Sequence, residues 1–150
     1  MRYTAKLAQV QPRLYSIWQT MKGRCNNPNR TKYKDYGGRG IKVCETWDKS
    51  AAAFVDWALS NGYRDGLQID RIDVNGGYNP DNCRWVTPKQ NARNRRNNRR
   101  IVIDGVSKCV SEWCEGAGIS RFTGYWWINS KGAQYAADRI KAAMVKEGAA

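Results

Sequence analysis

Histidine is absent from this 150-residue sequence, and long apolar runs are absent too. Without histidine, the chain lacks the side chain that most often acts as a general base near neutral pH. None of its apolar stretches approaches the roughly 18 residues that a membrane-spanning helix needs. The first residues, Met1 to Lys6, also lack the apolar core of a signal peptide. We therefore expect no membrane partner.

Cysteines are few and widely spaced. The sequence has five of them and no Cys-x-x-Cys pair. A structural zinc ion normally takes four nitrogen or sulfur ligands in paired spacing, so this pattern disfavours zinc and favours cysteines buried in a core. The odd number also departs from the disulfide pattern of secreted scaffolds, which indicates a reducing cytoplasm. The five are Cys25, Cys44, Cys83, Cys109 and Cys114.

Positive charge dominates the chain. The formal net charge is +13 and the pI is about 9.8. A balance of this kind points to a polyanionic partner, and the accompanying aromatic and amide side chains favour nucleic acid over a small-molecule substrate. No acidic residue occurs between Arg84 and Arg100, and the second half of this stretch is a dense run of arginines. Each arginine that neutralises a phosphate releases counterions, so we expect steeply salt-dependent binding.

The chain is organised around residues 67 to 98. Leu67, Ile69 and Ile72 alternate with polar residues and predict a half-buried strand. A turn-rich stretch follows, and residues 83 to 86 are suited to pair back as a second strand. Thr87 then fits an N-cap, with Pro88 at the first helical position and Gln90 at the capping-box position. The pattern predicts a β-hairpin followed by a helix.

This segment resembles the HNH endonucleases of phage and homing type. Asp70-Arg71-Ile72-Asp73 stands where that family has a strand ending in Asp-His-Ile-Asp, and the run from Asn82 to Thr87, followed by Asn91, is similar to the second half of the motif. The resemblance implies a ββα unit that holds one divalent metal, Mg²⁺ or Mn²⁺, against a phosphodiester. It implies Asp70 and Asn91 as metal ligands and Asn82 as the orienting residue. For a phage-encoded protein, the location would be the host cell cytoplasm.

Arg71 stands where the family has its general base. An arginine stays protonated, so it fits a phosphate clamp and not a proton acceptor. Water activation would then fall to Asp73, to a tyrosine such as Tyr78, to the metal or to another phosphate. Asp70 and Asp73, three apart on a strand, point to opposite faces and do not form a carboxylate pair. The alternative is a protein of this fold that binds DNA without cutting it.

Helices are expected to support the central unit. Residues 1 to 11 read as a loose basic arm, and an apolar stripe from residue 14 to 25 predicts a helix that starts at Pro12. The glycine-rich residues 36 to 41 are either a DNA-facing loop carrying Arg39 or a plain turn, followed by a short strand at 41 to 44. Residues 49 to 60 predict a second packing helix, closed by Asn61 and Gly62.

The C-terminal third predicts a short strand at 101 to 104, a helix at 107 to 115, a glycine-containing turn and a helix at 121 to 129. This order resembles the helix-turn-helix tails that follow nuclease cores, although an ordinary α-hairpin fits as well. Gly124 falls where an apolar core residue is expected. Trp126 and Trp127 fit core packing or stacking on a base. A last helix is expected at 133 to 147, with Ala136, Ile140, Ala143 and Met144 on its apolar face.

Together these features predict an α+β protein with a nuclease or DNA-binding domain at 1–98 and a helix-turn-helix-like tail at 99–150. The leading hypothesis is a metal-dependent endonuclease that acts on double-stranded DNA, with Asp70, Arg71, Asn82 and Asn91 at its site. A basic RNA-binding protein fits the charge but leaves the Asp-Asn-Asn spacing unexplained. The expected DNA contacts are Arg39, Arg84, Arg93, Arg95, Arg96, Arg99, Arg100, Ser120, Arg121 and Thr123.

Overall fold

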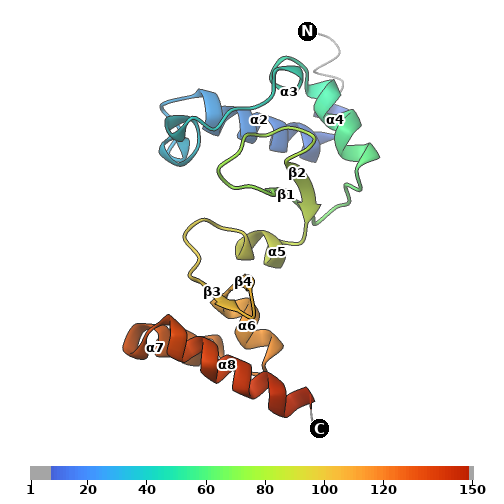
Figure 1. Cartoon of the computed structure of the whole chain (residues 1–150). Helices are drawn as coiled ribbons and strands as arrows, with labels where there is room; N and C mark the ends of the chain where they lie inside the picture. Colours follow the sequence, from blue (N-terminus) through green and yellow to red (C-terminus); the bar gives the residue numbers. More distant parts are fainter. Residues whose placement is uncertain (1–7, 149–150) are drawn as a thin grey trace. The chain divides into compact units, whose positions relative to one another are not determined.

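The computed structural model describes residues 8–148 and shows an α+β chain (Figure 1). It divides into two compact units, Met1–Asn91 and Ala92–Ala150. The boundary expected at residue 98 therefore falls inside the second unit. Most of the expected N-terminal arm lies outside the described residues, but residues 8–10 are helical and are not part of a loose arm. Among the described residues, no helix is both long enough and apolar enough to cross a membrane.

The helices of the first unit follow the predicted apolar patterns. Helix α2 spans Pro12–Asn26, and its buried residues include Leu14 and Met21. Helix α3, Glu45–Lys49, and helix α4, Ala51–Ser60, meet at Ser50, whose side chain accepts a hydrogen bond from the Ala53 N–H (3.2 Å). The helix predicted at 49 to 60 is thus confirmed from residue 51 onward. A hydroxyl at this position satisfies one of the free amides of the first turn, which is why α4 begins there.

A β-hairpin and a short helix form the centre of this unit. Strand β1, Gln68–Arg71, pairs antiparallel with strand β2, Cys83–Val86, in a register that sets Asp70 opposite Arg84. Helix α5, Pro88–Arg93, follows directly. The capping box is formed as predicted: Thr87 N donates to Gln90 Oε1 (2.9 Å), and Gln90 N donates to Thr87 Oγ1 (3.2 Å). The order strand, strand, helix is therefore confirmed.

The glycine-rich segment is two 3₁₀ turns, η1 (Tyr33–Asp35) and η2 (Gly37–Arg39). The strand predicted at 41 to 44 is wrong, because this stretch makes only a single parallel bridge between Val43 and Tyr78. A Cβ atom at Gly37 would lie 2.0 Å from the carbonyl oxygen of Cys25. The glycine is therefore needed for close packing on the end of α2, which favours the plain-turn interpretation at that position.

The core of the first unit joins α2, α3, α4 and the hairpin. Leu14, Met21 and Phe54 have no exposed surface, and Trp47 is nearly as buried. Trp57 and Trp85 pack against this core from α4 and β2, with ring centroids 6.0 Å apart. Burial of aromatic rings of this size supplies a large share of the hydrophobic free energy of a small unit.

The second unit begins with a hairpin that the sequence analysis did not expect. Strand β3, Arg100–Ile103, pairs with strand β4, Val106–Cys109, so the helix predicted at 107 to 115 starts only at Val110. The connecting residues Asp104 and Gly105 both have positive φ, at 50° and 79°. This is the conformation that Asp-Gly favours in a two-residue hairpin turn, and the β3–β4 ladder needs residues 107 to 109.

Three helices complete the second unit: α6 (Val110–Gly116), α7 (Arg121–Lys131) and α8 (Ala133–Gly148). Their order of helix, glycine-containing turn and helix agrees with the prediction. Gly124 is buried against Cys114 and Val110, so close helix packing takes the place of the apolar side chain expected there. On α8, Ile140 is fully buried, whereas Met144 is 37% exposed and lies at the edge of the predicted apolar face.

Candidate functional site

Asp70 sits on β1 with only 5% of its surface exposed. Arg84 lies opposite it on β2, and the Arg84 Nε is 3.0 Å from the Asp70 Oδ2. A carboxylate this buried needs charge-assisted hydrogen bonds, and Arg84 provides one. The Arg84 side chain is itself half exposed, so its outer part is open to a ligand.

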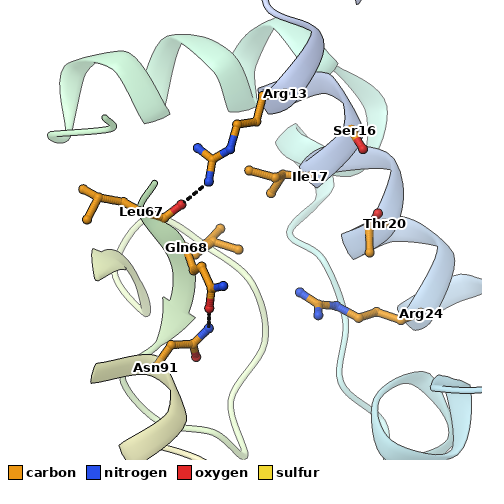
Figure 2. Close-up of a pocket in the computed structure, with 9 residues that line it drawn as sticks. Arg13, Ser16, Ile17, Thr20, Arg24, Leu67, Gln68 and Asn91 are labelled. Atoms are coloured by element: carbon orange, nitrogen blue, oxygen red, sulfur yellow. Dashed lines mark hydrogen bonds between the residues drawn. The ribbon is translucent and has the colours of Figure 1, made fainter. Parts of the chain in front are cut away.

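Asn91 reaches the hairpin from α5. Its Nδ2 donates to the Oε1 of Gln68 (2.8 Å), a contact drawn in Figure 2. Side chains alternate along a strand, so Gln68 and Asp70 share one face of β1. The structure therefore brings Asn91 to the hairpin face that also carries Asp70 and Arg84.

Asp70 and Asn91 offer a carboxylate and an amide oxygen, the ligand types that Mg²⁺ and Mn²⁺ take. Mg²⁺ commonly keeps several waters and uses only one or two protein oxygens. In residues 8–148, no group of three cysteine, aspartate or glutamate side chains gathers into a metal site. Arg84 holds the carboxylate that a cation would need. The two oxygens fit such a metal only if Arg84 turns away from Asp70, which its exposure permits.

Arg71, the neighbour of Asp70, points to the other face of the strand. It is 8% exposed, its Nη1 donates to the Gly76 carbonyl (2.7 Å), and its guanidinium lies over the rings of Tyr36 (5.0 Å) and Tyr78 (4.9 Å). These contacts hold Arg71 in the interior of the first unit. The structure does not bring Arg71 together with Asp70 and Asn91.

Tyr36 and Tyr78 form a stacked pair, with ring centroids 6.3 Å apart, and Arg24 lies over both rings. Tyr78 is 3% exposed, and burial raises the pKa of its hydroxyl well above the usual range. A phenol with a raised pKa stays protonated at neutral pH. Because Tyr78 is buried, the structure gives no support to Tyr78 as the group that activates water.

Asn82 braces the loop that joins the two strands. Its Oδ1 accepts from the Asp73 N–H (2.9 Å), and its Nδ2 donates to the carbonyls of Asp73 (3.1 Å) and Gly77 (2.8 Å). The loop residue Gly76 in turn supplies the acceptor for Arg71. Asn82 therefore orients the loop that holds Arg71, and Asp73 is an exposed member of that loop.

A cleft of about 340 Å³ lies beside Asn91. Figure 2 shows it between α2 on one side and the start of β1 with α5 on the other. None of its lining residues is acidic, and two are arginines. The sequence analysis assigned no role to Arg13 or Arg24. The lining residues are Arg13, Ser16, Ile17, Thr20, Arg24, Leu67, Gln68, Ile69 and Asn91.

The predicted DNA contacts in the arginine run differ in their surroundings. Arg95 and Arg96 are both exposed, and Arg96 also interacts with another part of the chain. Arg93 pairs with Glu115, and Arg99 bonds to Asn129. Arg100 donates to the carbonyl of Ser107 (2.7 Å). Part of this run thus stabilises the second unit.

Three further predicted contacts lie at the start of α7. Ser120 caps the helix by accepting from the Phe122 N–H (3.3 Å), Arg121 lies over the Phe122 ring (5.0 Å), and Thr123 is half-buried. In the first unit, Arg39 donates from Nη2 to the Asn75 Oδ1 (2.6 Å) and is otherwise exposed. The structure places Arg39 beside the β1–β2 loop.

The cysteines of the first unit gather in its core. Cys25 and Cys83 are buried, Cys44 is partly buried, and all three are free thiols. Burial raises the pKa of Cys25 and raises that of Cys83 to about 12. Metal ions bind the thiolate, so a raised pKa makes both residues poor ligands at neutral pH.

Comparisons of the chain with protein-family models, curated proteins and solved structures gave no match. The resemblance to the HNH endonucleases therefore rests on the residues of the hairpin and α5 described above.

Proposed function

We propose that this protein binds double-stranded DNA and hydrolyses a phosphodiester with a divalent metal at the face formed by Asp70 and Asn91. The observation that carries the proposal is the hairpin and helix arrangement that sets these two oxygen donors on one face. The chain that carries this face has a net charge of +13, which suits binding to a polyanion.

Different residues of the chain have different roles in this proposal. Asp70 and Asn91 would hold Mg²⁺ or Mn²⁺, which supplies Lewis-acid polarisation of the phosphate when bound. Arg84, freed from Asp70, contacts the phosphate. Arg71 and Asn82 fix the β1–β2 loop. The exposed arginines Arg39, Arg95 and Arg96, together with the first turn of α7, contact the DNA backbone or groove.

Plasmid nicking in Mg²⁺ and in Mn²⁺ tests the proposal. We expect the wild type to nick, and Asp70→Ala and Asn91→Ala to nick at least about 100-fold more slowly, because each loses a metal ligand. Asp81→Ala and Asn97→Ala are the matched controls, since both residues are exposed and of the same two types. Equal rates in all five proteins would point to a contaminating nuclease and would sink the proposal.

A second candidate function, DNA binding without cleavage, is favoured by the Asp70–Arg84 ion pair and by the position of Arg71. Arg84 occupies the carboxylate, and Arg71 is neither a base nor on the same face. Salt-sensitive binding without nicking in either metal would establish this alternative. A gel shift in which the protein prefers single-stranded or structured RNA to duplex DNA would contradict both.

The free thiols accord with a reducing cytoplasm, which is the cytoplasm of the host cell for a phage-encoded protein.

A further inference from the structure

The cleft beside Asn91 is lined largely by hydrogen-bond donors. The guanidinium groups of Arg13 and Arg24 come from α2, as do the hydroxyls of Ser16 and Thr20. Its volume of about 340 Å³ lies at the lower end of the range for ligand cavities. The lining holds two cations and no carboxylate. The ion pair of Arg13 with Asp65, which is not a lining residue, is long at 3.9 Å and Asp65 is almost fully exposed, so the cleft favours an anion. The lining therefore has the chemistry of a phosphate site.

Aromatic rings hold the guanidinium of Arg24 in place. Its guanidinium lies over Tyr36 (4.5 Å) and Tyr78 (5.0 Å), and its hydrogen bond to the Tyr36 hydroxyl is long, at 3.4 Å. Within residues 8–148, its buried Nε has no hydrogen-bond partner. Figure 2 shows the side chain reaching from α2 across the cleft toward the hairpin. Ring faces orient a cation without neutralising its charge, so Arg24 retains capacity for an anionic partner.

Arg13 is fixed at the other end of the cleft. Its Nη1 donates to the Tyr63 hydroxyl (2.7 Å) and its Nη2 to the Leu67 carbonyl (2.5 Å). A guanidinium has five N–H donors, so these two bonds leave donors for a ligand. Because both arginines are already ordered, binding an anion costs little side-chain entropy.

We propose that this cleft binds one phosphate group of a nucleic-acid backbone, held by Arg24 and Arg13 with the hydroxyls of Ser16 and Thr20. The proposal rests on the proposed function and adds a phosphate site beside the candidate metal ligand Asn91. The bound phosphate positions the strand, and α2 becomes part of the DNA-binding surface. The same chemistry would accept a free mononucleotide, so the test separates these two sources.

The experiment places a carboxylate at the cleft without altering the arginines. Thr20→Glu and Ser16→Glu change exposed cleft residues, and Gln19→Glu makes the same charge change at an exposed position of the same helix outside the cleft. Affinity of the full-length proteins for a fluorescent DNA duplex is measured by anisotropy in EDTA, so that cleavage plays no part. We expect Thr20→Glu and Ser16→Glu to weaken binding about tenfold, and Gln19→Glu about twofold or less.

A second variant tests the arginine itself. Arg24→Gln should weaken DNA binding and reduce the slope of log Kd against log salt by about 0.9, the loss of one phosphate contact. A thermal melt identifies any effect that comes from loosening the tyrosine pair. Lys34→Gln, an exposed cation of the same unit, is the matched control for lost charge.

Each outcome decides something. If the wild type binds DNA and Thr20→Glu equals Gln19→Glu, the cleft proposal is overturned and the proposed function stands. If the wild type binds no DNA, the proposed function fails. The cleft is then judged by calorimetric titration with deoxyadenosine monophosphate. Binding that Thr20→Glu loses and Gln19→Glu keeps would identify a nucleotide site, and no binding would overturn the cleft.

Discussion

Replacement of Gly124 by alanine should destabilise the second unit, although the same change in most helices is favourable. Gly124 lies in α7 at its contact with α6. An alanine Cβ at this position would lie 2.3 Å from the Cys114 Sγ and 3.1 Å from the Val110 Cγ1. Cys114 and Val110 have no exposed surface, so neither side chain has free space into which to withdraw.

The expected magnitude is the difference of two opposing effects. Alanine is favoured over glycine inside a helix by about 1 kcal/mol. An extra methyl group forced into a packed core costs about 1–3 kcal/mol. A contact of 2.3 Å to a buried sulfur lies at the severe end of such overlaps, so we expect a net loss of about 1–2 kcal/mol in the free energy of unfolding of the second unit.

Two companion variants test whether this overlap causes the loss of stability. Gly116→Ala, in α6, meets no atom within 4 Å and should stabilise the unit by up to about 1 kcal/mol. Cys114→Ala removes the clashing sulfur, so combining it with Gly124→Ala should recover at least about 1 kcal/mol relative to the sum of the single changes. The assay is native-state hydrogen exchange of α6 and α7 amides, which reports opening of this unit itself. A stabilising Gly124→Ala, or additive single changes, would refute the argument.

Three further predictions concern other parts of the chain. Arg71→His should lower the melting temperature and leave nicking no faster than in the wild type, because residue 71 faces the tyrosine pair; faster nicking would show that it reaches the phosphate. Phe122→Ser and Trp126→Ser, on the exposed face of α7, should weaken duplex binding several-fold in an anisotropy titration, and the exposed control Val145→Ser should not. Burial raises the pKa of the Cys83 thiol to about 12 in the folded protein, whereas the unfolded chain loses this proton near the ordinary thiol pKa of 9.0. Stability should therefore fall as pH rises above 9, and urea titrations at pH 8 and 10 should show about 1 kcal/mol less loss in Cys83→Ala.

Local signals in the sequence predicted much of the first unit. The apolar stripe of α2 and the capping box of Thr87 and Gln90 act through neighbours within one or two turns of the chain, so they can be recognised without knowledge of the fold. The hairpin strands were likewise marked by alternation and by the turn residues between them. The Asp104-Gly105 hairpin carried an equally local signal and was missed, because Ser107 was interpreted as the start of a helix.

Residues from distant segments determine what local patterns leave open. Gly37 is required by the carbonyl of Cys25, twelve positions earlier, and Gly124 by the side chain of Cys114 on another helix. Neither glycine has a local cause that distinguishes it from an ordinary turn or helix residue. Their roles follow only from packing between elements. For this reason the sequence left two interpretations of the glycine-rich segment open and led us to expect an apolar side chain at position 124.

In the candidate site, too, the sequence predicted some features, whereas others depend on distant segments. The resemblance implied Asp70 and Asn91 as ligands of one metal, and the bond to Gln68 brings Asn91 to the hairpin face that carries Asp70. The pairing of Asp70 with Arg84 depends on the register of the hairpin, which a long connecting loop leaves undetermined. The cleft also escaped prediction, because its two sides come from α2 and from β1 with α5.

The alternation of side chains along β1 links these observations. In the HNH resemblance, adjacent residues of one strand supply a metal ligand and a base. Here the strand geometry sends Asp70 to the face shared with Asn91 and sends Arg71 toward Tyr36 and Tyr78. Arg71 has thereby become a packing residue whose acceptor, the Gly76 carbonyl, belongs to the loop that Asn82 braces. A histidine placed at 71 would enter the same cluster. In the proposed function, the group that meets a phosphate on the Asp70 face is therefore Arg84, which binds charge but takes no proton.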